Sequence, residues 1–124
     1  MRAAISDELM NMITEKIYID LEINVLHNRL EKAVKANNEE LIPKLNKIIY
    51  TVTRERKHIN SLLRENNIKV FEPEYFYDSP DADPIFIDYR YYQKVKGGYK
   101  EGSQRFWKDA IKYKLKLRVQ RHFN

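Results

Sequence analysis

The sequence contains no cysteine. This absence excludes disulfide bonds, zinc sites built from thiolates, and enzymes with a cysteine nucleophile. It also fits a reducing compartment. Only three glycines and four prolines occur among the 124 residues, and neither a glycine-rich phosphate loop nor a G-x-S-x-G nucleophile elbow is present. The chain therefore lacks common signatures of nucleotide-binding proteins and of serine and cysteine hydrolases.

Long hydrophobic runs are also lacking. No charge-free apolar stretch approaches the ~18 residues that span a bilayer, and the first residues lack the apolar core of a signal peptide. We therefore expect a cytoplasmic protein with no membrane partner. A chain of this length suits a single domain that buries a core without disulfide or metal staples.

Metal chemistry has few candidate ligands in this sequence. His27 and His58 fall about ten residues apart along the expected helical hairpin, too far to share an ion, and His122 lies at the far end of the chain. Six carboxylates occur between residues 72 and 88, but this stretch lacks the glycine and the closing glutamate of a calcium-binding loop. We predict a non-enzymatic protein with no catalytic residue, no metal or other cofactor, and no small-molecule substrate.

The charges are unevenly distributed along the chain, which has a net charge of +5. Residues 1–66 carry eleven basic and ten acidic side chains, and residues 67–92 carry two basic and six acidic. Residues 93–124 carry ten basic and two acidic. The basic side chains of residues 93–124 therefore have three possible partners: a nucleic acid, another protein, or the protein's own acidic stretch.

The first half of the sequence has a helical period. Apolar residues recur at alternating steps of four and three over residues 5–33 and again over residues 41–62, which is typical of two helices that pack along a seam. A reset near Asn37 and Asn38 predicts a short connection, and a short connection makes the helices antiparallel neighbours. The first helix also carries a second apolar stripe, which must be covered either by the C-terminal half or by another copy of the chain. Its members are Met10, Ile13, Ile17 and Leu21.

Thirteen of the fifteen aromatic residues follow residue 66. In this half, residues 68–71 predict a short strand, residues 78–84 a turn-rich connector, and residues 85–92 a strand with alternating faces. The segment from Lys96 to Gly102 predicts a loop, because it contains all three glycines.

The C-terminal segment fits two structures. Apolar and basic residues alternate from Ile111 to Val119, as in a half-buried strand, yet the absence of glycine and proline from Ser103 to His122 favours a helix that begins at Ser103. We predict the helix. Its cations and rings are the ingredients of nucleic-acid binding, and the candidate residues are Lys112, Lys114, Lys116, Arg118, Arg121, Trp107 and Tyr113.

These patterns predict an α+β fold that is predominantly α, in one domain. Residues 5–66 form a long antiparallel helical hairpin, residues 67–102 an aromatic and acidic segment with one or two short strands, and residues 103–123 a basic C-terminal helix. The leading functional hypothesis is a protein–protein interaction or regulatory module, with self-association through the hairpin stripe as one form of it. The alternative is a nucleic-acid-binding accessory protein that uses the basic C-terminal segment.

Overall fold

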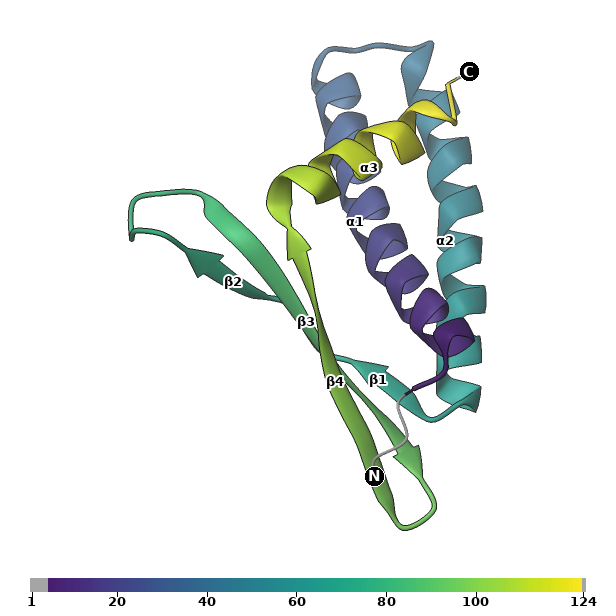
Figure 1. Cartoon of the computed structure of the whole chain (residues 1–124). Coiled ribbons are helices and arrows are strands. Elements are labelled where there is room, and N and C mark those ends of the chain that lie inside the picture. The colour runs from purple at the N-terminus through teal and green to yellow at the C-terminus, as the bar shows by residue number, and fades with distance from the viewer. Residues whose placement is uncertain (1–4, 124) are drawn as a thin grey trace.

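The computed structural model describes residues 5–123. Two long helices come first, α1 (Asp7–Lys35) and α2 (Leu41–Glu65). Four strands follow, β1 (Ile68–Val70), β2 (Glu74–Tyr77), β3 (Pro84–Val95) and β4 (Gly98–Trp107). The last element is the helix α3 (Lys108–Gln120), which lies across the hairpin (Figure 1).

The predicted antiparallel hairpin is confirmed, and its ends follow from local capping. The Ser6 hydroxyl accepts a hydrogen bond from the backbone N–H of Leu9 at 3.3 Å, which caps the start of α1. Between the helices, Asn37 adopts a left-handed conformation with φ 52°, and the Asn38 side chain accepts a bond from the Leu41 N–H at 3.2 Å. Asparagine tolerates this conformation better than other non-glycine residues, and the chain therefore reverses in five residues.

The sheet is larger than the one or two strands predicted. The strand β3 is central: β4 pairs with it along one edge, and both β1 and β2 pair with it along the other. The short strand β2 was not predicted, because prolines and aspartates surround it. The predicted glycine loop is also wrong in part, since only Lys96 and Gly97 separate β3 from β4, and Gly102 lies inside β4 opposite Tyr91.

The C-terminal helix begins at Lys108, not at Ser103. Residues 103–107 belong to β4 instead, where Ser103 pairs with Arg90 and Trp107 with Phe86. Backbone pairing with β3 fixes these residues as strand, and this long-range interaction overrides their local helical pattern. From Lys108 onward the helical interpretation is confirmed.

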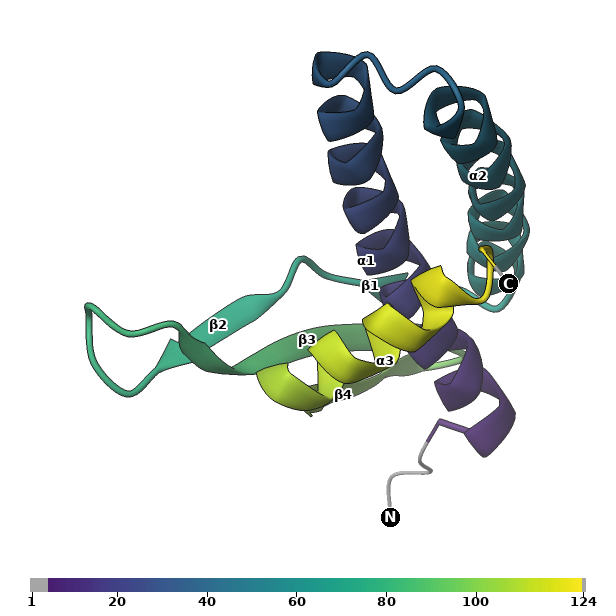
Figure 2. The ribbon, with the colours of Figure 1, turned by 90° about the horizontal axis from the view of Figure 1, so that it is seen from above.

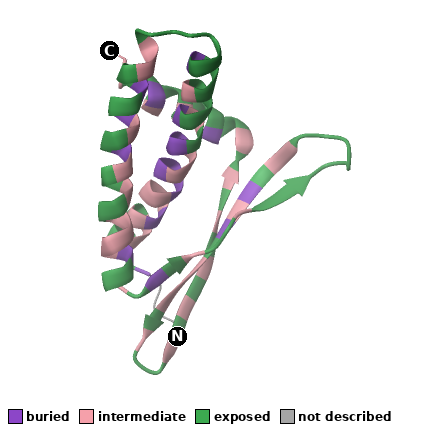
Figure 3. Ribbon diagram, turned by 180° about the vertical axis from the view of Figure 1, so that it is seen from behind, coloured by how far each residue is buried: buried purple, intermediate pink, exposed green. Residues whose placement is uncertain are grey.

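The core consists of two clusters of buried residues, and α1 contributes to both. One part lies between α1 and α2 and includes Leu26, Leu45 and Val52. The other lies between α1, the inner face of the sheet and α3, and its buried members include Ile13, Ile17, Ile87 and Ile111. Figure 2 shows α1 and α3 beside the strands, and Figure 3 shows the buried residues in the helices and in the middle of β3.

The fold class is confirmed: three helices and a four-stranded antiparallel sheet make an α+β protein that is predominantly α. No helix within residues 5–123 is both long enough and apolar enough to cross a bilayer.

Gly102 provides a test of the sheet register. A Cβ atom at this position would lie 2.6 Å from the hydroxyl oxygen of Tyr91 and 2.8 Å from the nearest ring carbon. We expect Gly102→Ala to lower the free energy of unfolding by about 1–3 kcal/mol, because the ring must shift within a packed layer. Urea denaturation measures this change. Ser103→Ala, at an exposed neighbouring position, is the control, and in a Tyr91→Ala background Gly102→Ala should cost nothing.

Candidate interaction surface

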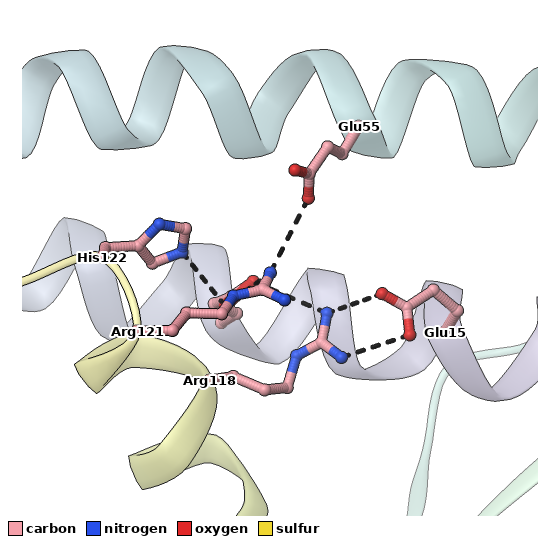
Figure 4. Close-up of polar contacts among 6 residues, drawn as sticks. Glu15, Glu55, Arg118, Arg121 and His122 are labelled. Carbon is pink, nitrogen blue, oxygen red and sulfur yellow. Dashed lines mark hydrogen bonds and ion pairs between the residues drawn. The ribbon is translucent and has the colours of Figure 1, made fainter. Parts of the chain in front are cut away.

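The two arginines of the basic tail point into the protein. Both Nη atoms of Arg118 donate hydrogen bonds to the Glu15 carboxylate of α1, at 3.1 and 2.7 Å. Arg121 lies 3.5 Å from Glu22 of α1 and 3.8 Å from Glu55 of α2. Figure 4 shows these side chains between the three helices. Arg118 and Arg121 therefore link the C-terminal segment to the helical hairpin through hydrogen bonds and ion pairs.

Glu22 is the buried charge at the centre of this cluster. Its exposed fraction is 0%, and its Oε1 atom lies 3.5 Å from Arg121 Nη2 and 3.4 Å from Nε2 of His122. Its Oε2 atom lies 3.7 Å from Arg118 Nη2 and has no hydrogen-bond partner within residues 5–123. A buried carboxylate is costly without cations beside it, so α3 must dock in one position to supply them.

The pKa values in the cluster reflect the same pairing. The hydrogen bonds from Arg118 are the largest influence on Glu15, and they hold the pKa of this carboxyl below its usual value. Burial opposes the charge of Arg118, but its bonds to Glu15 and the nearby carboxylates outweigh burial and raise the pKa of the guanidinium. Both groups are therefore charged at neutral pH.

Within residues 5–123, the acidic stretch pairs with the basic segment at two points. Arg105 of β4 forms two hydrogen bonds with Asp88 of β3, at 2.7 and 3.0 Å, and Lys108 lies 3.9 Å from Asp83. The remaining carboxylates of this stretch do not converge, and no three acidic or histidine side chains within residues 5–123 are placed to hold a metal ion. The predicted pairing of the acidic stretch with the tail therefore stops at the start of α3.

The remaining candidates for nucleic-acid contact lie mainly on the outer side of α3. Lys112, Tyr113 and Lys116 are exposed, as is Trp107 at the end of β4. Lys114 is exposed too, but its ammonium group sits over the buried ring of Tyr18 at 5.3 Å. The structure thus divides the predicted set, because Arg118 and Arg121 hold the fold together while three lysines and two rings remain on the surface.

The predicted hairpin stripe is covered within the chain and is not an accessible surface. Ile13 and Ile17 are only 0% and 1% exposed, and they pack with Ile87 of the sheet and Ile111 of α3. Met10 and Leu21 pack against the same cluster and are partly buried. The C-terminal half therefore covers the stripe, which is one of the two predicted ways of covering it.

A different surface is uncovered: the outer face of the sheet. Alternate residues of β3 face the helices, as buried Ile87 and Tyr89 do, so the intervening residues and their cross-strand partners face outward. Figure 1 shows the strands extending away from the helices, and Figure 3 shows exposure alternating along them. We call this surface the aromatic sheet face, after its six aromatic residues: Phe76, Phe86, Tyr92, Tyr99 and Trp107 of the strands, and Phe71, which follows β1 and contacts the Tyr92 ring.

The rings on the aromatic sheet face are large and accessible. Tyr99 and Trp107 are 56% and 55% exposed, and Phe71, Phe76 and Phe86 are also exposed. Arg105 ties three strands together there, because its guanidinium lies 4.8 Å from the centre of the Phe76 ring and 5.2 Å from that of Phe86 while it binds Asp88. At the other end of the face, the Tyr92 and Tyr99 rings meet edge to face at 5.3 Å.

Charges of both signs are mixed among these rings. The register places four cations on the face, Lys69, Arg90, Lys94 and Arg105, and three carboxylates, Glu74, Asp88 and Glu101. The outer face therefore combines exposed rings with charges of both signs. The alternation of β3 was read correctly from the sequence, but the strand partners that make the outward residues one surface were not.

The chain matches no known family model, and no curated protein or solved structure has a detectable similarity to it. Geometry and chemistry therefore carry the functional argument alone.

The role of the arginine cluster is tested by a pair of substitutions on α3. We expect Arg118→Met to lower the free energy of unfolding by about 3 kcal/mol, because it leaves the buried charge of Glu22 poorly compensated. Lys116→Met, two residues away on the exposed side of the helix, should change it by less than about 0.5 kcal/mol. Chemical denaturation measures both. Equal effects would contradict the structural role of Arg118.

The lowered pKa of Glu15 predicts a pH dependence of stability. A carboxyl whose folded pKa is depressed contributes stability that is fully present above its unfolded pKa, near 4.5, and is lost as the pH falls through the folded pKa. The free energy of unfolding should therefore decline more steeply below pH 4.5 in the wild type than in Glu15→Gln. Denaturation series from pH 7 to pH 3 test this. In an Arg118→Met background the two curves should become nearly parallel, since the largest cause of the lowered pKa of Glu15 is gone.

Proposed function

We propose that this protein is a non-enzymatic protein-interaction module and that its contact surface is the aromatic sheet face. The observation that carries the proposal is a set of five exposed aromatic side chains, together with the half-buried Tyr92, on the outer side of a sheet whose inner side packs on α1 and α3. Monomeric soluble proteins rarely leave a large apolar patch uncovered, and such patches commonly mark binding sites. Aromatic residues and arginine also contribute most strongly to protein interfaces.

The mixed charge of the face favours a protein partner over a nucleic acid. Sheets that bind single-stranded nucleic acids combine stacking rings with a positively charged groove that follows the phosphates. Here Glu74, Asp88 and Glu101 lie among the rings and would repel phosphates. The alternative, nucleic-acid binding through α3, is weakened because Arg118 and Arg121 are already paired with glutamates. It retains Lys112, Lys116 and Tyr113 as its exposed contacts.

Site-specific photo-crosslinking in the cells that make the protein tests this proposal. A photoreactive benzoylphenylalanine in place of Tyr99 should give a covalent protein adduct, because the face lies against a partner. The same residue in place of Tyr50 is the matched control, since Tyr50 is a tyrosine of similar exposure on α2, away from the sheet. It should give no adduct or a different one.

The nature of the adduct separates the hypotheses. Protease-sensitive adducts from position 99 alone support the proposal. Nuclease-sensitive adducts would favour the nucleic-acid alternative instead. So would a photoreactive residue in place of Tyr113 that gives adducts when position 99 gives none. Identical adducts from positions 50 and 99 would contradict a specific role of the sheet face.

A further inference from the structure

We infer that the occupant of the aromatic sheet face is a second copy of this chain, packed face to face and antiparallel about a two-fold axis. This inference rests on the proposed function and names its partner. It depends on the distribution of charge along β3, which makes the face complementary to itself.

The two ends of the sheet carry opposite charge. At one end of the face, Glu74 and Asp88 outnumber Arg105, and the loop between β2 and β3 adds three aspartates. At the other end, Lys69 and Lys94 outnumber Glu101, and the turn between β3 and β4 adds Lys96. Arg64 of α2 joins the basic end, where it lines an open hollow of about 330 Å³ with Lys69, Lys94, Tyr92 and Tyr99. A rotation that reverses β3 therefore places the acidic end of one copy over the basic end of the other.

The strand order makes the correspondence specific. Because β1 and β2 lie along the same edge of β3, a two-fold axis across the strands puts β2 of one copy over β1 of the other. Arg90 is the outward residue nearest the middle of β3. A two-fold axis through this residue places residue 88 of one copy over residue 92 of the other. Glu74 lies opposite Asp88 and Lys69 lies opposite Tyr92, so Glu74 of one copy faces Lys69 of the other.

The same axis pairs charges on the other edge. Arg105 of β4 lies opposite Asp88 and therefore faces Glu101 of the second copy, which lies opposite Tyr92. Symmetry repeats each contact, so one register forms four attractive pairs. Arg90 itself lies at the axis, and the carboxylates of Glu72, Glu74 and Glu101 line the same hollow of about 250 Å³ and offset its charge.

The twist of the sheets is compatible with these pairs. Packed sheets cross at about 30°, but residues two positions from the axis are only about 7 Å from it along the strand, so the rotation displaces them by roughly 3 Å. The face is about 40 Å long, from the twelve residues of β3, and three strands wide, or roughly 600 Å². Stable interfaces commonly bury about 800 Å² per partner, so this dimer should be of the weaker, concentration-dependent kind.

Sedimentation velocity over a range of protein concentrations tests the self-association. The wild type should shift from monomer to dimer as concentration rises. Lys69→Glu and Glu74→Lys should each raise the dissociation constant about tenfold or more, because each sets like charges opposite one another twice. Lys47→Glu, an exposed lysine on α2, is the matched control and should leave the constant unchanged. Circular dichroism checks that every variant is folded.

Mixing the two weakened variants is the decisive measurement. In the antiparallel arrangement, the glutamate introduced at position 69 faces the lysine introduced at position 74, and the native Glu74 and Lys69 face each other as before. An equimolar mixture of Lys69→Glu and Glu74→Lys should therefore dimerise about as well as the wild type. A parallel packing, or a contact elsewhere, would give no recovery on mixing.

The outcomes separate this inference from the proposed function. A wild type that stays monomeric, or a mixture that shows no recovery, overturns the two-fold dimer. If Tyr99 is then crosslinked to a protein of another mass, the interaction face stands and only its occupant was wrong. If position 99 gives no protein adduct at all, the proposed function fails as well.

Discussion

The helix α1 is apolar on two faces, and the rest of the structure depends on covering both of them. One face packs on α2 through the seam that includes Ile23 and Leu26. The other contains Ile13 and Ile17, and the inner side of the sheet and α3 together cover it. A helix with two apolar stripes needs a packing partner on each side, and α2 supplies one while the sheet and α3 supply the other.

A buried carboxylate then determines how α3 lies across the hairpin. Apolar contacts alone, through Ile111 and Val119, would tolerate small rotations of the helix, but Glu22 requires cations at fixed distances. Arg118, in the last turn of α3, and Arg121, at the C-cap of that helix, supply them and also reach Glu15 and Glu55. Such a cluster contributes less to net stability than its number of ion pairs implies, because desolvation opposes it, and we attribute to it mainly the choice of orientation.

Local periodicity predicted the parts of the fold that local interactions determine. The hairpin followed from its apolar repeat and from the reset at Asn37 and Asn38. The alternation of β3 was equally clear. The boundary between β4 and α3 was misplaced, because no glycine or proline marks it and only pairing with β3 keeps residues 103–107 extended. The partners of Arg118 were not predictable, since Glu15 is 103 residues away in sequence and the two meet only after α3 has docked.

The same reasoning explains why the candidate surface could not be found from the sequence. Phe76, Phe86 and Tyr99 belong to three strands, and only the register places them on one face. That face differs from the buried one in a way that suits a contact made and broken in water. The inner side carries Ile87 and Tyr89 with no neighbouring charge on the same strand face, whereas charged residues separate the outer rings.

Interspersed charges keep an aromatic surface soluble when it is unoccupied. They also restrict which surface can cover it, because an occupant must place opposite charges at matching intervals. The aromatic rings can therefore supply affinity for many apolar surfaces, while the order of charges along β3 selects among them.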